Sequence, residues 1–137
     1  MVEMELSRTI IDENREEQVI VLKEINGTRI FPIVIGIYEA AAIDRKIKDI
    51  KTARPLTHDL ILSLIKALNA SITKVVINDL KKNTFYAKIY LNADGNDIEI
   101  DSRPSDAIVL AVHLRCPIYV EEKILDDVGT SSDEIQP

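Results

Sequence analysis

The sequence contains little cysteine and few aromatic residues. Its 137 residues include one cysteine, Cys116, and no tryptophan, and phenylalanine and tyrosine together make up only 4%. A single cysteine cannot form a disulfide within the chain, which favours a reducing compartment, so we expect a cytoplasmic protein. With so few aromatic side chains, surfaces on which nucleic-acid bases could stack are expected to be few.

Long apolar runs and the common cofactor motifs are missing as well. No apolar stretch approaches the roughly 20 residues that a membrane-spanning helix needs, so no membrane association is predicted. The first residues alternate in polarity and carry Glu3 and Glu5, which is unlike a secretory signal peptide. The chain has no glycine-rich dinucleotide loop, no phosphate-loop lysine motif and no zinc-spaced cysteine or histidine pair. These absences exclude the most readily recognised classes of nucleotide and zinc enzymes.

Acidic residues outnumber basic ones, but the two kinds are unevenly distributed. The net charge is −6, and residues 121–137 alone carry −5, which leaves the other 120 residues nearly neutral at −1. A local basic cluster stands within that neutral part, formed by Arg45, Lys46, Lys48, Lys51 and Arg54. The cluster is either a solvated helix face or a patch that steers phosphate groups to a site.

The order of predicted elements indicates an α+β fold. Strands are predicted over residues 2–6, 18–24, 29–35, 72–80, 85–91, 98–100 and 118–120, and helices over residues 36–50, 57–68, 104–115 and 122–128. Tight turns at Asn26-Gly27 and Asp94-Gly95 favour antiparallel pairing. We therefore expect a mixed, largely antiparallel sheet with three main helices and a short C-terminal helix.

Two of these helices are expected to bury an apolar stripe. Thr57 is the predicted N-cap of the second helix. In the third strand, Pro32 is expected at a sheet edge or strand margin because its backbone nitrogen donates no hydrogen bond. The predicted stripes are Ala40, Ile43, Ile47 and Ile50 in the first helix, and Ile61, Leu64, Ile65 and Leu68 in the second. The helix beginning at Pro104 is apolar all round, which is typical of a helix held between two layers.

Two short stretches of the chain share one layout. Residues 54–61 and 101–108 each place Arg-Pro before a hydroxyl residue, then an aspartate, then an apolar helical run. Backbone N–H groups are free at the start of a helix, so such a position can hold an anion or fix a carboxylate. The repeat predicts a site where the two helix starts and Glu39 come together.

Three carboxylates in this region could act together. Glu39, Asp101 and Asp106 would provide oxygen ligands for Mg²⁺ or Mn²⁺, which is the usual arrangement for metal-assisted phosphodiester hydrolysis. In the alternative reading Glu39 forms a salt bridge with an arginine. Asp106 then complements its helix dipole, and Asp101 pairs with Arg103.

Basic residues and a histidine complete the candidate site. Arg54 and Arg103 could bind phosphate in a bidentate manner, with Lys51 beside them. His58, in a first helical turn, could act as a neutral base, although it could equally be an ordinary packed histidine. His113 is expected to be a buried structural histidine.

Four motifs resemble the bifunctional nuclease domain family. They are Gly-Ile-Tyr-Glu-Ala at residues 36–40, Arg-Pro-Leu-Thr-His-Asp-Leu at 54–60, Asp-Ser-Arg-Pro-Ser-Asp-Ala-Ile at 101–108 and Pro-Ile-Tyr-Val at 117–120. The resemblance covers residues 2–128 and implies a small bacterial member of the family that hydrolyses both DNA and RNA. It also implies a homo-oligomer. We expect residues 1–128 to form this domain and residues 129–137 to be a frayed acidic tail.

Two functions are consistent with the sequence. In the first, the protein is a nuclease in which Glu39, Asp101 and Asp106 hold the metal, His58 assists proton transfer, and Arg54, Arg103 and Lys51 bind nucleic acid. In the second, it is a non-catalytic oligomeric module, a dimer being favoured. There the Arg-Pro and Asp motifs are structural ion pairs, and the apolar third helix packs in the interface between copies.

Overall fold

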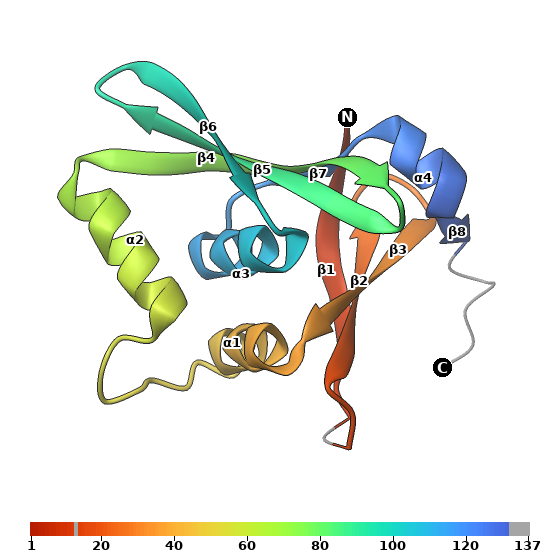
Figure 1. Cartoon of the computed structure of the whole chain (residues 1–137), viewed down its shortest axis with the longest axis horizontal. Coiled ribbons are helices and arrows are strands. Elements are labelled where there is room, and N and C mark those ends of the chain that lie inside the picture. Colours follow the sequence, from red (N-terminus) through yellow and green to blue (C-terminus); the bar gives the residue numbers. More distant parts are fainter. Residues whose placement is uncertain (13, 132–137) are drawn as a thin grey trace.

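The computed structural model describes residues 1–12 and 14–131, and within them the fold is α+β, as predicted (Figure 1). The strands are β1 (Val2–Ile10), β2 (Glu17–Glu24), β3 (Arg29–Gly36), β4 (Ala70–Lys81), β5 (Thr84–Ala93), β6 (Asn96–Ser102), β7 (Ile118–Val120) and β8 (Thr130–Ser131). The helices are α1 (Ile37–Ile47), α2 (Thr57–Ala67), α3 (Pro104–Leu114) and α4 (Glu122–Val128). No helix in the described part is long and apolar enough to cross a membrane.

The strands form one mixed sheet in the order β6-β5-β4-β7-β1-β2-β3-β8. Every neighbouring pair is antiparallel except β4 and β7, which run parallel. The sheet bends strongly, so that β4, β5 and β6 run across the direction of β1, β2 and β3 (Figure 1). This bend leaves a concave side in which helices can be enclosed.

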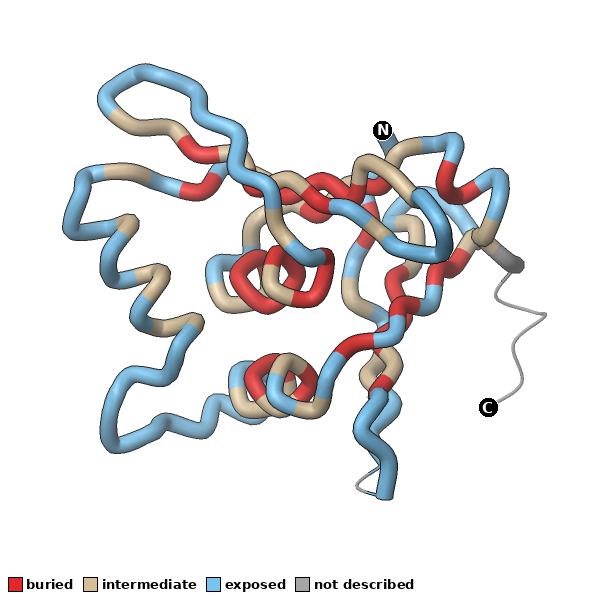
Figure 2. The backbone as a smooth tube through the Cα atoms, in the orientation of Figure 1, coloured by how far each residue is buried: buried red, intermediate tan, exposed pale blue. Residues whose placement is uncertain are grey.

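Helix α3 occupies the centre of that concave side. Ala107, Ile108, Val109, Leu110 and Ala111 are all buried, and Figure 2 shows the buried positions of α3 facing those of the strands and of α1. The prediction that this apolar helix lies between two layers is confirmed. Because α3 packs inside its own fold, the expectation that it forms an interface between copies is wrong.

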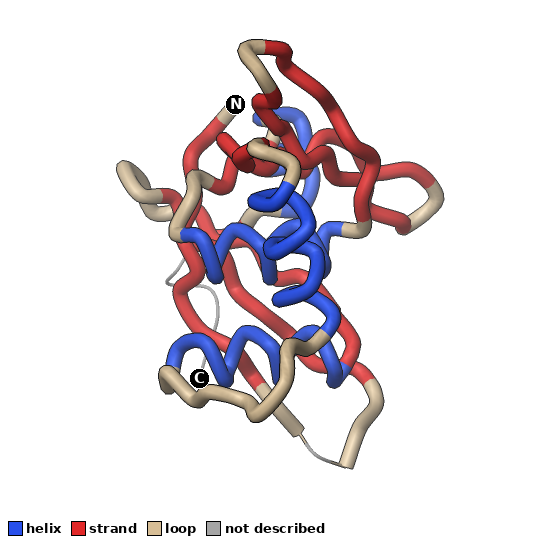
Figure 3. Tube along the Cα trace, turned by 90° about the vertical axis from the view of Figure 1, so that its left-hand side faces the viewer, coloured by secondary structure: helices blue, strands red, loops and turns tan. Residues whose placement is uncertain are grey.

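Helix α2 is covered less than the sequence pattern predicts. It lies at the rim beside β4 and α3, and Figure 3 shows it on the outer side of the other helices. None of its residues is buried: Ile61 and Ile65 are half-buried, whereas 55% of Leu64 and 74% of Leu68 is exposed. The predicted buried stripe is therefore wrong in half of its members, because only one side of this helix has a partner.

Two smaller differences concern the ends of elements. Helix α1 stops at Ile47, whose side chain is exposed together with that of Ile50, so the predicted stripe is buried only at Ala40 and Ile43. The N-cap of α2 is Leu56, one residue before the predicted Thr57.

The two edges of β3 explain the position of Pro32. Among the described residues, strand β8 pairs with Arg29 and Ile30, so Pro32 has the neighbouring strand β2 on one side alone, in agreement with the predicted edge position. Because Thr130 and Ser131 form β8, regular structure continues beyond the predicted domain boundary at Val128, and residues 132–137 of the predicted tail lie outside the described residues.

Candidate functional site

Four of the predicted site residues form one connected network. Arg103 donates from its guanidinium to Glu39 Oε1 at 2.9 Å and to Asp106 Oδ2 at 2.9–3.0 Å. The other carboxylate oxygen of Asp106 lies 2.9 Å from Nε2 of His58, a residue 48 positions away in sequence. The two Arg-Pro helix starts, which the sequence left unplaced, are therefore joined directly through the His58–Asp106 hydrogen bond.

The network stands where the first turns of three helices meet. Glu39 lies in the first turn of α1, His58 in the first turn of α2 and Asp106 in the first turn of α3. Arg103 is the N-cap of α3, with Pro104 at the predicted first helical position. Free backbone N–H groups and the positive ends of three helix dipoles thus converge here, which favours carboxylates and would favour a bound phosphate.

Arg103 is the electrostatic centre of the network. Its hydrogen bonds to Asp106 first, and then to Glu39, raise the pKa of the guanidinium further above its already high ordinary value. The side chain of Glu39 is only 13% exposed, whereas that of Arg103 is 68% exposed. The predicted half-buried position of Glu39 and its ion pair with an arginine are therefore confirmed. The guanidinium also keeps one side open to solvent.

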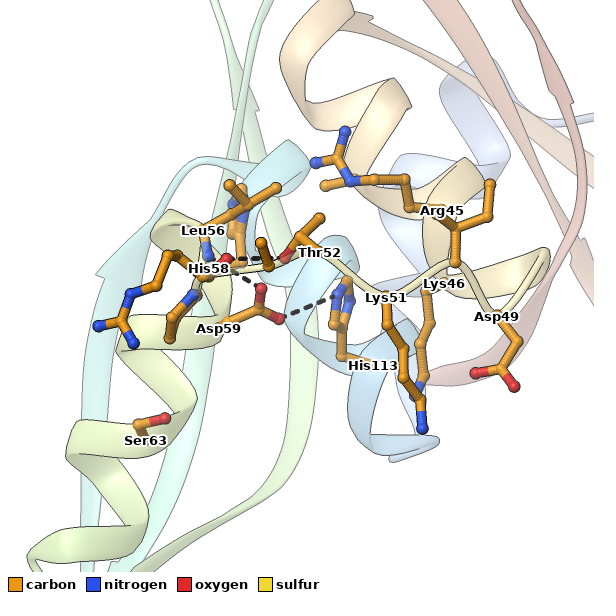
Figure 4. A pocket seen from close by; sticks show the side chains of 15 residues that line it. Arg45, Lys46, Asp49, Lys51, Thr52, Leu56, His58, Asp59, Ser63 and His113 are labelled. Atoms are coloured by element: carbon orange, nitrogen blue, oxygen red, sulfur yellow. Dashed lines mark hydrogen bonds and ion pairs between the residues drawn. The ribbon is translucent and has the colours of Figure 1, made fainter.

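Lys51 and Arg54 lie on a different side of His58. Together with Arg45 and Lys46 they line a cavity of about 400 Å³, here called the basic cavity, into which His58 also opens. Figure 4 shows Lys46 and Lys51 extending in the same direction from this wall. Within the described residues none of the four cations forms an ion pair. Their charge is therefore free to attract a phosphate backbone.

A second hollow adjoins the other side of His58. This apolar groove has a volume of about 620 Å³, and Glu39, Asp101, Arg103 and Asp106 line its rim. Its floor is aliphatic and consists of Ile61, Ile65, Ile89, Leu91, Ile100 and Leu110. His58 lines both hollows, so it stands at their junction.

The three predicted metal ligands do not gather around one point. Glu39 and Asp106 bind the same guanidinium, and Asp101 is exposed at the groove rim without a contact to either. No three histidine, cysteine or acidic side chains in the described part of the chain are arranged to hold a metal ion. The predicted Mg²⁺ or Mn²⁺ site does not fit these residues, because Arg103 occupies the position between the two nearest carboxylates.

The sequence analysis missed a second histidine–aspartate pair. Asp59 accepts a hydrogen bond from the backbone N–H of Leu56 at 3.0 Å, and its other oxygen lies 3.8 Å from Nε2 of His113 (Figure 4). Both side chains line the basic cavity. The available signal was spacing: Asp106 and His113 stand seven residues apart, two turns along one face of α3, while His58 and Asp59 are consecutive.

Comparison with known proteins shows the family to which this chain belongs. The family model described as the bifunctional nuclease domain matches residues 20–133. An uncharacterized protein of Mycobacterium tuberculosis is 42% identical over 119 residues, which cover 87% of this chain and 71% of that protein. Bifunctional nuclease 1 and bifunctional nuclease 2 of rice are 26% and 27% identical over 80% and 90% of this chain. The matched segments cover only 34% and 39% of the two rice proteins.

Proposed function

The chain belongs to the bifunctional nuclease domain family, and from this premise we propose that it hydrolyses phosphodiester bonds of DNA and RNA in the cytoplasm. The observation that carries the proposal is the His58–Asp106 hydrogen bond at the junction of the basic cavity and the apolar groove. A histidine oriented by a carboxylate, next to unpaired cations, is the minimum needed to move a proton beside a bound phosphate.

His58 is the proposed general base. Because Nε2 faces the Asp106 carboxylate, the neutral ring carries its proton on Nε2 and leaves the Nδ1 lone pair free to accept a proton. Asp106 in turn is fixed from its other side by Arg103. This arrangement orients the imidazole before substrate arrives, which is the usual role of the acidic partner in such pairs.

Phosphate binding is assigned chiefly to the basic cavity. Lys51 and Arg54 stand there without acidic partners, whereas Arg103 already satisfies two carboxylates. Arg103 is therefore proposed to position His58 through Asp106 and to contact phosphate only with its exposed side.

The binding part of the proposal is tested with Lys51→Gln/Arg54→Gln. We expect the double variant to bind a fluorescent single-stranded oligonucleotide more weakly, with the slope of log K against log salt reduced by about 1.4, since two phosphate contacts are lost. Cleavage of the same oligonucleotide should show a raised KM. Binding is measured by fluorescence anisotropy over a series of salt concentrations.

Lys82→Gln is the matched control, because Lys82 is exposed in the turn between β4 and β5 and lines neither hollow. It should leave affinity, salt slope and KM unchanged. A wild-type protein that cleaves neither DNA nor RNA, with EDTA or with added Mg²⁺ or Mn²⁺, would contradict the proposed function as a whole.

A second candidate function, an oligomeric module, is favoured by the outer face of α2. Leu56, Leu60, Leu64 and Leu68 repeat every fourth residue and are all exposed, which forms an apolar ridge along the helix. We propose that a second copy of the chain covers this ridge. Two such ridges related by a two-fold axis can interdigitate, and no ridge position carries a charge that would oppose its own copy.

Leu64→Glu tests the proposed dimer. We expect the wild type to scatter light as a dimer and the variant as a monomer, because two carboxylates would meet near the two-fold axis without a partner. Lys82→Glu is the control for an added acidic side chain. A wild type that stays monomeric up to about 100 µM would remove this candidate. Equal nuclease activity of the wild type and Leu64→Glu would show that the ridge and the proposed site are separate.

A further inference from the structure

The two histidines of the chain are arranged as a crossed pair between α2 and α3. Helix α2 supplies the consecutive residues His58 and Asp59, and α3 supplies Asp106 and His113 two turns apart. His58 reaches Asp106 and Asp59 faces His113, so each helix provides one histidine and one carboxylate. Both rings therefore lie at the first turn of α2: His58 belongs to this turn, and His113 of α3 faces it.

His113 is held in a defined orientation with one nitrogen open. Its Nδ1–H donates to the backbone carbonyl of Val109 at 2.8 Å, which leaves Nε2 as the nitrogen that faces Asp59. The 3.8 Å between Nε2 and the Asp59 oxygen is too long for a hydrogen bond, so Asp59 leaves Nε2 open. Because Nδ1 already carries a proton, Nε2 donates to an incoming oxygen atom when the ring is an imidazolium, with both nitrogens protonated. Asp59 itself is fixed by the backbone N–H of Leu56 and cannot turn away freely.

The surroundings of the two rings are alike. Each histidine side chain is 14% exposed, and both line the basic cavity together with the unpaired cations Arg45, Lys51 and Arg54. A phosphodiester drawn into the cavity by these cations would therefore meet two imidazoles, each backed by a carboxylate. No group of three histidine, cysteine or acidic side chains in the described residues is arranged to hold a metal ion, and the two imidazoles are the groups here that can move both protons of the reaction.

We infer that His113 is the general acid that works with His58, and that the two histidines cleave RNA without a metal ion. The inference rests on the proposed function and adds to it a second catalytic residue and a specific substrate class, a ribonucleotide phosphodiester. The products it requires are a 2′,3′-cyclic phosphate and a free 5′-hydroxyl.

The step balances with the groups present. Nδ1 of His58 takes the proton of the ribose 2′-hydroxyl, and the 2′-oxygen forms a bond to phosphorus. The bond between phosphorus and the 5′-oxygen breaks, and the imidazolium form of His113 gives its Nε2 proton to that leaving oxygen and becomes neutral. No oxidant, reductant or water enters this step. DNA has no 2′-hydroxyl, so the DNA cleavage of the proposed function would need a water molecule as the nucleophile and is separate from this step.

The experiment separates the acid from the base by the choice of leaving group. Purified full-length wild type, His58→Ala and His113→Gln are assayed in EDTA on a fluorescent oligoribonucleotide and on a nucleoside 3′-(4-nitrophenyl phosphate). The aryl leaving group needs no proton. We expect His113→Gln to lose roughly 10²-fold or more on the oligoribonucleotide and only a few-fold on the aryl ester. His58→Ala should lose activity on both substrates.

A pH profile provides a second measurement. The charged and titratable groups around the two rings are Asp59 and Asp106 opposite them, Arg45 and Lys46 from α1, and Asp49, Lys51 and Arg54 from the loop before α2. With the wild type, kcat/KM on the oligoribonucleotide should rise and then fall with pH. His113→Gln should remove the alkaline limb, because the group that must stay protonated is gone.

Several results would overturn the inference while leaving the nuclease proposal standing. They are a loss of RNA cleavage in EDTA, wild-type products with a 5′-phosphate end, and an equal loss of both substrates in His113→Gln. Product analysis by mass spectrometry uses only the wild type, so it remains decisive if His113→Gln fails to fold. Absence of cleavage under every metal condition would instead contradict the proposed function itself.

Discussion

Asp106→Asn is expected to lower nuclease activity by about 10²–10⁴-fold, measured as kcat/KM on a fluorescent oligonucleotide. The asparagine has nearly the same shape, but its amide cannot accept hydrogen bonds from both His58 and Arg103 with the strength of a carboxylate. His58 then loses the partner that fixes its tautomer and its orientation. The main effect should fall on kcat, because phosphate binding is assigned to the basic cavity.

Glu39→Gln is the matched control for this substitution. Glu39 is the other carboxylate bound to Arg103, yet it has no contact with His58. Removing its charge leaves the His58–Asp106 pair and one of the two Arg103 ion pairs in place, so activity should fall only a few-fold. If Glu39→Gln lost as much activity as Asp106→Asn, with unchanged thermal stability, the four residues would act as one unit and the specific role of His58 would be wrong.

Much of the fold could be predicted because local rules and tertiary packing agree over most of the chain. Strict alternation in β1 and β5 and the Asp94-Gly95 turn fixed these strands to within a few residues. Pro104 began α3 at the predicted position for the same reason. These signals depend only on neighbouring residues, so no knowledge of the packed structure was needed.

The prediction failed for α2 because hydrophobic periodicity gives a direction only when one side of a helix is polar. This helix is apolar at Ile61 and Ile65 and also at Leu60, Leu64 and Leu68. The pattern could not show that α2 would stand at the rim of the fold, where the sheet covers one side alone. The position of a helix relative to the sheet is a long-range property, and spacing along the chain does not contain it.

The sequence predicted which residues lie at the site better than it predicted which of them contact one another. The sequence grouped Glu39, His58, Arg103 and Asp106 because all four stand at or near predicted helix starts, where free N–H groups favour the two carboxylates. It could not show that Arg103 would stand between Glu39 and Asp106, which is why these carboxylates do not form the predicted cluster in this arrangement. It also did not predict that Asp59 would face His113, because the two residues lie on different helices.

Ile108→Ala is expected to lower the free energy of unfolding by about 2–5 kcal/mol, which corresponds to a fall in Tm of roughly 7–17 °C. Ile108 is fully buried on α3, at the centre of the concave side of the sheet, and surrounding elements hold their places too firmly to fill the space left. Thermal unfolding followed by circular dichroism measures the change.

Leu64→Ala on α2 is the comparison for this prediction, because the sequence predicts that both residues are buried, Leu64 in the apolar stripe of α2 and Ile108 in a helix that is apolar all round. As Leu64 is 55% exposed, its truncation in a monomer should cost no more than about 0.5 kcal/mol. A larger cost that grows with protein concentration would mean that a second copy covers the ridge, since association stabilises the folded state by mass action. If both variants lowered the free energy of unfolding equally at every protein concentration, Leu64 would have to be buried within the monomer. The exposed position of Leu64 on α2 would then be wrong.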